Sequence, residues 1–305
     1  MAETALKFDE IKTLISSMEH PSCSARDTFA DMDQISRIKY WLNFAAERQV
    51  FEIKRPRLSL YAASHGIAQQ DEAQQGYFKD MVSKLLAGDH AVNEVINLAS
   101  ADLRLYDLNM DEPTADLRSG DAMDDQALLN SLAYGLMTVE PENDLVSIAA
   151  IGAGSEEVGR AICHNFMPFI DSKLKIDIAD VDLEGFFAML KASSGYELNA
   201  IIGAILATRL AGVPVILEGY TAIAAALLLD ALNPDTHWHC AIAPSLDGHD
   251  AASRDYFESK NWLVLDDPRP YGLKQASAIN GGMQIAALRQ MLILDNFYNP
   301  DKMAS

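Results

Sequence analysis

The stretch Asp144–Arg160, DLVSIAAIGAGSEEVGR, decides the fold of this chain. Within it, Leu145–Ile151 is a short apolar run without charge, which is long enough for a buried strand and too short for a core helix. Gly152–Gly154, two glycines around one alanine, then breaks the run. The pattern predicts a strand that ends in a glycine turn and leads directly into a helix.

The helix after this turn begins with polar and acidic residues. Ser155 is placed to cap the helix, and Glu156 and Glu157 fall in its first turn. A glycine turn before a helix N-terminus is a common place to bind a phosphate or a carboxylate. The two glutamates argue against an anion here, because they already occupy the positive end of the helix dipole.

The composition bounds the class of protein. The 305 residues suffice for one large domain with a smaller one, and 49% hydrophobic residues predict a substantial core. The formal net charge of -20 argues against a nucleic-acid partner, because little positive charge is available to neutralise phosphates. It also argues against binding to an anionic membrane surface. We therefore expect neither a nucleic acid nor a membrane as a partner.

Cysteine usage and the apolar stretches predict a cytoplasmic protein. Cys23, Cys163 and Cys240 are odd in number and far apart, so they form no disulfide framework and fit a reducing compartment. The N-terminus lacks the basic region and apolar segment of a secretory signal. Charge or glycine interrupts Leu198–Leu217 and Tyr220–Leu229 before they reach membrane length, and we expect both to be buried helices.

Short apolar runs alternate with helical patterns along the chain. Alternation of this kind predicts an α/β fold, a parallel sheet with helices on both faces, whose ligands bind outside the carboxyl ends of the strands. The polar stretch Gln69–Gly76 and the acidic stretch Asn109–Asp125 are expected to be loops. Strands are expected at Leu58–Ser64, Ala101–Leu108, Leu145–Ile151, Val213–Leu217, His239–Ala243 and Trp262–Leu265.

Six segments, in series and at similar spacing, resemble the motifs of one enzyme family. The family motifs are Asp-His-Gly after a strand, Gly-Gly-Ala-Ala-Ile-Asn, Gly-Glu-Met-Gly-Ile-Gly-Asn-Thr-Thr, Gly-Gly-x-Glu-Ile-Ala-Ala-Met-x-Gly, Asp-Gly-Phe after a strand, and Ser-Ala-Glu-Pro-Gly-His. The matching segments are PRLSLYAASHGIA (Pro56–Ala68), AGDHAVN (Ala87–Asn93), AAIGAGSEE (Ala149–Glu157), SSGYELNAIIGAILA (Ser193–Ala207), VPVILEGYTAIAAALL (Val213–Leu228) and SLDGH (Ser245–His249). The chain thus resembles the nicotinate-nucleotide:dimethylbenzimidazole phosphoribosyltransferases of cobalamin biosynthesis.

This resemblance implies both an architecture and a reaction. It implies a Rossmann-like parallel sheet in a large ligand-binding domain, residues 39–280, and a small helical domain built from residues 1–38 and 281–305. It implies transfer of ribosyl phosphate from nicotinate mononucleotide to a benzimidazole-like base. The expected partners are a nucleotide, an aromatic base and a second subunit, in a homodimer or in a heterodimer with a related chain. No cofactor and no metal are expected.

The chain differs from the family at the residues that carry out the family's chemistry. In the family a glutamate before the last helix removes the proton of the attacking base, and Ile279 stands at that position. Ala150 replaces the glutamate of the Gly-Glu-Met-Gly motif, and Ser64 replaces the aspartate of Asp-His-Gly. The resemblance therefore identifies a divergent member without the family's catalytic glutamate.

Two hypotheses about function follow. In the first, the chain is a divergent transferase with a relocated base, for which Glu156, Glu157 and Glu218 are candidates; the alternative for Glu156 and Glu157 is that they are solvated acids. In the second, the chain has lost catalysis and binds a base or a nucleoside, or is the non-catalytic partner of a competent subunit. The expected substrate-binding residues are Ser64, His65, Asn93, Gly152, Gly154, Ser155, Gly195, Glu197, Gly219, His249, Ile279 and Gly281.

Overall fold

The computed structural model describes residues 6–19, 32–50, 52–140, 142–178, 182–243, 250–266 and 281–298. Within these residues the strands form one six-stranded sheet in the order β2-β1-β3-β4-β5-β6, and every neighbouring pair is parallel. The predicted α/β fold with a parallel sheet is confirmed. The strands are β1 Pro56–Ala62, β2 Asp102–Asp107, β3 Leu145–Ile151, β4 Val215–Glu218, β5 Cys240–Ile242 and β6 Leu263–Val264.

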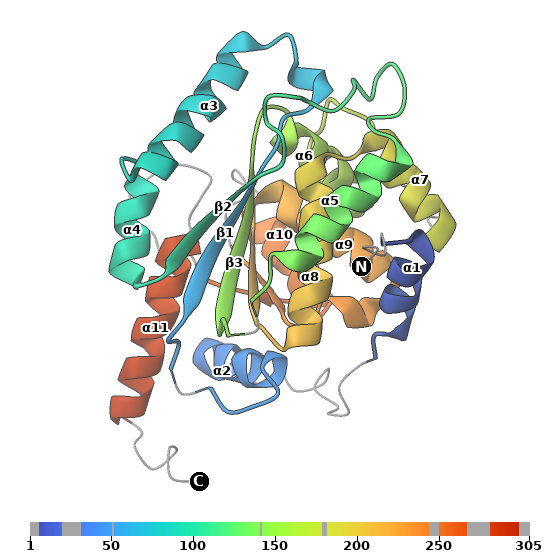
Figure 1. Cartoon of the computed structure of the whole chain (residues 1–305). Coiled ribbons are helices and arrows are strands. Elements are labelled where there is room, and N and C mark those ends of the chain that lie inside the picture. Colours follow the sequence, from blue (N-terminus) through green and yellow to red (C-terminus); the bar gives the residue numbers. More distant parts are fainter. Residues whose placement is uncertain are drawn as a thin grey trace, which may run out of the picture.

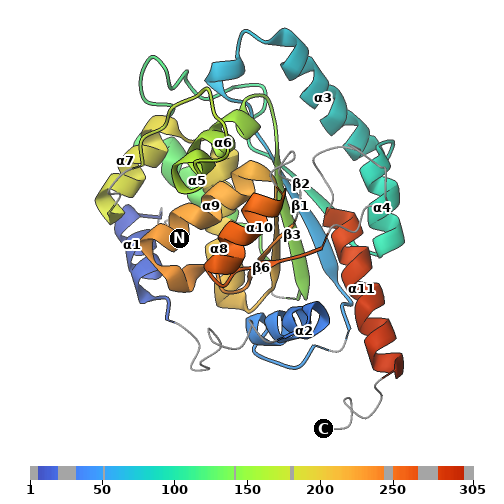
Figure 2. The same ribbon diagram turned by 180° about the vertical axis from the view of Figure 1, so that it is seen from behind.

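Helices cover both faces of the sheet (Figures 1 and 2). Helices α5, α6, α8 and α9 pack with β3 and β4 in the largest core cluster. On the other face, α3 and α4 pack in one smaller cluster, and α2 and α11 pack in another. The helices are α1 Phe8–Ser17, α2 Gln34–Ala45, α3 Glu72–Ala87, α4 Ala91–Ala99, α5 Asp125–Met137, α6 Ser155–Phe166, α7 Leu183–Ser193, α8 Tyr196–Ala211, α9 Gly219–Leu232, α10 Asp250–Ser259 and α11 Gly281–Tyr298.

Of the two long apolar stretches, Tyr220–Leu229 lies in α9, as predicted, whereas Leu198–Leu217 is helical in α8 only as far as Ala211, and its last residues belong to β4. Most residues of both helices are buried, because both lie between the sheet and a further layer of helices. Gly135 of α5 permits close packing against α8, because a Cβ at Gly135 would lie 1.8 Å from the carbonyl oxygen of Ala200. In the part of the chain that is described, no helix combines the length and the apolar character needed to cross a bilayer.

One predicted loop is wrong. The polar composition of Gln69–Gly76 predicts a loop, but α3 begins inside this stretch, at Glu72. The side chain of Asp71 caps the helix by accepting a hydrogen bond of 2.9 Å from the backbone N–H of Gln74. A run of glutamines without apolar residues carries no helical periodicity, and therefore only the cap could have signalled this start.

The first and the last helix, α1 and α11, lie on different sides of the sheet (Figures 1 and 2). Ile11 and Ile15 of α1 belong to the largest core cluster, and the ring of Phe8 lies 4.8 Å from that of Phe187 in α7. Helix α11 packs instead in the cluster that includes α2, and Lys39 of α2 forms an ion pair with Asp295. The division into a large and a small domain stays a prediction.

The strand order places a topological switch point between β1 and β3. The chain leaves β1 to form β2 on one side, and every later strand is added on the other side. In open parallel sheets, the connections on the two sides of such a point diverge and leave a crevice at the carboxyl ends of the strands. The residues that follow β1 and β3 therefore border the expected ligand site.

Candidate functional site

Two turns meet at the switch point. The turn after β1 contains Ser64 and His65, and the backbone N–H of His65 donates a hydrogen bond of 2.8 Å to the carbonyl oxygen of Ala153, in the turn after β3. Gly152 has a φ of +149°, and a Cβ there would lie 1.5 Å from the carbonyl oxygen of Ala63. The glycine is required because the two backbones approach so closely.

A buried pair, His65 and Glu197, lies behind these turns. Glu197 comes from the first turn of α8, and its Oε1 lies 2.6 Å from His65 Nε2 although the residues are 132 positions apart. Their exposures are 1% and 0%. Burial raises the pKa of the Glu197 carboxyl, but its electrostatic interaction and hydrogen bond with His65 outweigh burial, and the pKa falls below its ordinary value. Glu197 is therefore a carboxylate that is hydrogen-bonded to Nε2 of the imidazole.

Two glycines make room for this pair. A Cβ at Gly195 would lie 2.2 Å from His65 Nε2 and 2.4 Å from Glu197 Oε2. A Cβ at Gly154 would lie 2.8 Å from that of His65. Any larger residue at Gly195 would have to displace the ring or the carboxylate. The structure therefore brings together four predicted residues, His65, Gly154, Gly195 and Glu197.

The start of α6 is already hydrogen-bonded within the chain. The N–H of Gly154, one of the expected substrate-binding residues, donates to Gln74 Oε1 at 2.9 Å. Ser155 Oγ lies 3.1 Å from Thr221 Oγ1, and Thr221 donates to the carbonyl oxygen of Ser155 at 3.0 Å. Neither Gln74 nor Thr221 is identified by the sequence. Gln74 lies in the stretch predicted to be a loop, and a threonine at the start of an apolar helix carries no signal of its own.

The acidic residues proposed as relocated bases occupy different environments. Glu156 and Glu157 are exposed, and Glu156 forms an ion pair of 2.8 Å with Arg160, one turn along the helix. The arginine in turn lies 4.2 Å from the centre of the Tyr220 ring. Their placement agrees with solvated acids at a helix start.

Glu218 is buried at the end of β4, with 1% exposure. Its Oε2 accepts a hydrogen bond of 2.9 Å from the N–H of Gly281, the first residue of α11. A Cβ at Gly281 would lie 2.2 Å from Ser147 Oγ, so this helix start packs directly on β3. Glu218 thus neutralises a helix N-terminus. Gly219, which follows it, has a φ of +78° and open space around it.

Asn93 does not join this cluster. Asn93 caps α4: its side chain accepts from the N–H of His90 at 3.2 Å and donates to the carbonyl oxygen of Leu85 at 3.0 Å. His249 and Ile279 lie outside the described residues. The sequence places all three near the substrate through motif order alone, which does not fix side-chain direction.

The acidic stretch between β2 and α5 runs beside the turn after β1. It has no helix or strand before α5 begins at Asp125, as predicted. The N–H of Thr114 donates to the carbonyl oxygen of Ser64 at 3.2 Å, and its Oγ1 accepts from the N–H of Gly66 at 3.3 Å. A Cβ at Gly66 would lie 2.4 Å from the backbone of Ala115. This loop is therefore fastened to the rim of the site.

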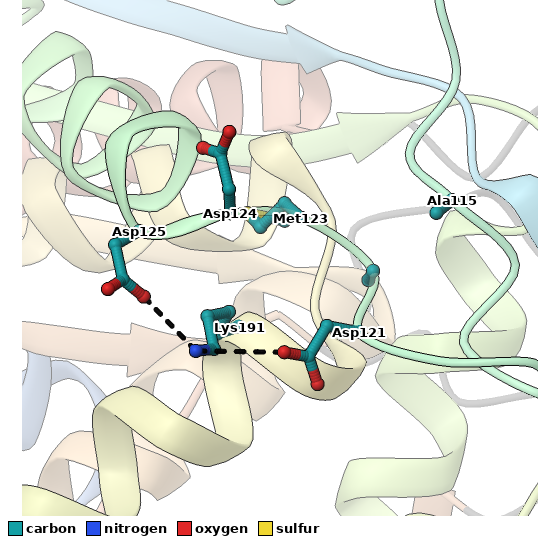
Figure 3. A pocket seen from close by; sticks show the side chains of 7 residues that line it. Ala115, Asp121, Met123, Asp124, Asp125 and Lys191 are labelled. Carbon is teal, nitrogen blue, oxygen red and sulfur yellow. Dashed lines mark ion pairs between the residues drawn. The ribbon is translucent and has the colours of Figure 1, made fainter.

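A surface cavity of about 470 Å³ lies at the far end of this loop (Figure 3). Lys191, at the end of α7, points between Asp121 and Asp125, with distances of 3.6 and 3.2 Å. Acidic residues dominate the polar lining, so this cavity suits an anionic ligand poorly. None of the predicted site residues lines it. Among the described residues, no three His, Cys, Asp or Glu side chains gather around a potential metal position.

The fold and the site define a doubly wound α/β protein with a polar site at its β1/β3 switch point. A family model described as phosphoribosyltransferase matches residues 30–173 and 169–254, so the chain belongs to this family. The resemblance found in the sequence is confirmed.

Curated relatives carry the same family name. The nicotinate-nucleotide–dimethylbenzimidazole phosphoribosyltransferase of Rhizobium rhizogenes is 28% identical, with 79% of this chain and 81% of that protein covered. The protein of the same name from Brucella melitensis is 25% identical over the same shares. The crystal structure of the Thermus thermophilus protein shares the fold, with a TM-score of 0.63 at 18% identity, covering 94% of this chain and 95% of that one.

Proposed function

We propose that this chain binds a nicotinate nucleotide and a benzimidazole-like base, and transfers ribosyl phosphate from the first to the second. The observation that carries the proposal is the His65–Glu197 pair. These residues belong to two separate segments that resemble family motifs, and they meet at 2.6 Å at the switch point, where this class of fold binds ligands. The named relatives and the matching family model support the same reaction.

The reaction makes a definite demand on the site. One nitrogen of the base attacks the anomeric carbon of the ribosyl phosphate, and the bond from that carbon to nicotinate breaks. The other nitrogen must lose its proton to an acceptor. Glu156 and Glu157 face solvent, and Glu218 is engaged with the start of α11. A transferase of this sequence needs a different acceptor.

The proposal is tested by mixing the purified chain with nicotinate mononucleotide and dimethylbenzimidazole and analysing the products. Release of nicotinate together with formation of the ribosylated base is the expected result. Calorimetric titration with each substrate alone separates binding from transfer. A chain that binds neither substrate would contradict the proposal and leave the fold as the sole property shared with the family.

The second candidate is a binding protein without transfer, alone or as the non-catalytic subunit of a pair. Ile279, at the position of the family's glutamate, favours it, and so do the two exposed glutamates beside the glycine turn. Replacing both Glu156 and Glu157 by threonine distinguishes the candidates. Tighter nucleotide binding without turnover would support a lost enzyme, whereas loss of an activity present in the native chain would support relocated chemistry.

We extend the proposal to the setting of the protein. The family resemblance suggests a homodimer or a heterodimer with a related subunit, and the scarce, separated cysteines suggest the cytoplasm. Light scattering of the purified chain tests the first suggestion, since a monomer at working concentration would contradict it. Fractionation of cells that make the protein tests the second.

A further inference from the structure

One ring nitrogen of His65 is buried without a partner. Nε2 is held by Glu197, but Nδ1 has no hydrogen-bond partner, and less than 1 Å² of it is exposed. A buried polar atom without a partner is destabilising, and the great majority of such atoms in folded proteins are bonded. This one lies at the switch point where the sheet binds its ligand.

The carboxylate determines what Nδ1 can do. A carboxylate accepts hydrogen bonds, so in the neutral imidazole the proton lies on Nε2 and points at Glu197; this tautomer is assigned from the hydrogen bond. Nδ1 then carries a lone pair and accepts a proton or a hydrogen bond. The same arrangement, a histidine oriented by a buried carboxylate, makes an imidazole a general base in hydrolases.

We infer that His65 Nδ1 accepts the N–H of the bound aromatic base and takes its proton during transfer, in the role left open by Ile279. The inference rests on the proposed function. Glu197 is then a positioning residue, since it acts on the substrate through the imidazole. Two glycines, Gly154 and Gly195, leave the room that the pair occupies.

The proposed step balances. The free nitrogen of the base donates its lone pair to the anomeric carbon, and the bond from that carbon to nicotinate breaks, with its electron pair remaining on the nicotinate nitrogen. The N–H proton of the base moves to His65 Nδ1. The imidazolium that forms is stabilised by the Glu197 carboxylate, 2.6 Å from its other nitrogen. Because Nδ1 is covered in the free chain, the base must displace the covering residues as it enters.

The test compares two substitutions and two ligands. His65→Gln keeps an amide N–H where Nε2 donates to Glu197 but removes the basic nitrogen. His239→Gln is the matched control, since His239 is also 1% exposed and bonds Thr208 through Nε2. Dimethylbenzimidazole has an N–H to donate, whereas N-methylbenzimidazole has none. Calorimetry measures the binding of each ligand, and nicotinate release measures kcat and KM.

The expected result is specific to the N–H. His65→Gln weakens binding of dimethylbenzimidazole by about tenfold, the effect of one hydrogen bond, and leaves N-methylbenzimidazole unchanged. It lowers kcat by about 100-fold or more, the usual contribution of a general base, with little change in KM for the nucleotide. His239→Gln changes none of these quantities. Turnover that survives in His65→Gln would overturn the inference and leave the proposed function intact.

Two further outcomes are distinct. If the native chain binds the base but releases no nicotinate, the proposed function fails, and the two-ligand comparison alone decides the inference. Equal weakening of both ligands, or weakening of the nucleotide instead, would overturn it. If His65→Gln does not fold, nitrogen NMR of the native imidazole decides: the Nδ1 signal should shift with dimethylbenzimidazole and stay in place with N-methylbenzimidazole.

Discussion

Two buried histidines, at opposite ends of helix α8, show how differently one side chain is used in this molecule. His65 lies after a strand, at the carboxyl edge of the sheet, and meets Glu197 in the first turn of α8. His239 lies just before β5, at the amino edge, and meets Thr208 in the last turn of α8, at 2.9 Å. Both are 1% exposed. The first has a charged partner and a free nitrogen; the second has a neutral partner.

The two environments suit different roles: that of His65 suits chemistry, and that of His239 suits packing. Burial, with a smaller contribution from nearby Arg209, lowers the pKa of His239 to about 3, so this ring stays neutral and serves the core. A buried carboxylate is expensive to keep ionised, and the chain keeps one beside His65 at the edge where ligands bind. A buried carboxylate with a shifted pKa and a specific partner, in such a position, is typical of functional sites.

The largest expected effect concerns His239 and pH. The pKa of His239 in the folded chain, about 3, lies below the value of 6.5 for an unperturbed histidine. Between these two pH values the unfolded chain therefore binds a proton at this residue and the folded chain does not. Stability from this group is complete above pH 6.5 and is lost as the pH falls toward 3, by roughly 5 kcal/mol in total at 1.36 kcal/mol per pKa unit. Urea unfolding at several pH values measures this loss.

The control for that experiment is His239→Gln, which has no group to titrate there. Its free energy of unfolding should depend less steeply on pH across the same window. If the free energies of unfolding of the native chain and the variant change equally with pH, the acid sensitivity does not come from His239.

The next largest effect concerns the packing around His65. Gly195→Ala should destabilise the chain by about 2–3 kcal/mol, because the new Cβ would lie 2.2 Å from the His65 ring, which has no room to move. Gly76→Ala, in the middle of α3 with nothing within 4 Å, is the matched change and should stabilise by about 0.5–1 kcal/mol. Denaturant unfolding of both variants gives the comparison, and equal effects would show that the site is not tightly packed.

A smaller effect compares the two partners supplied by α8. Glu197→Gln should cost about 1–2 kcal/mol at neutral pH, and Thr208→Val about 1 kcal/mol, since a charged acceptor bonds more strongly than a hydroxyl. The depressed pKa of Glu197 means that its stabilisation is present above the ordinary value of 4.5 and is lost as the pH falls below it. Glu197→Gln should remove that part of the acid sensitivity. A larger cost for Thr208→Val would reverse the comparison.

The smallest effect is expected at the exposed acid nearest the glycine turn. Glu156→Gln should change the free energy of unfolding by less than about 0.5 kcal/mol, because its ion pair with Arg160 is open to solvent. A thermal melt in low and in high salt measures it. A large loss would show that the helix start depends on this carboxylate.

The sequence was sufficient for the sheet and insufficient for the site. A buried strand in a parallel sheet is a local apolar run, and each of the six segments expected to be strands overlaps a strand of the sheet, although β1 begins earlier, at Pro56, and β4 ends later, at Glu218. The meeting of His65 with Glu197 depends on how α8 crosses the sheet, and the bond from Gly281 to Glu218 depends on where the last helix lies. Neither is encoded in spacing along the chain. Family resemblance identified all four residues but gave none of these contacts.

The position of α11 has a consequence for synthesis of the protein. Its residues Ile285, Leu288 and Leu292 complete the cluster that covers the β4–β6 side of the sheet, together with Trp41 and Leu42 of α2. Because α11 follows all six strands in the sequence, it is synthesised after them, and these three residues cannot cover this side of the sheet until the helix has left the ribosome. A nascent chain that has formed these strands but lacks α11 exposes an apolar surface, which promotes aggregation and makes a chaperone useful.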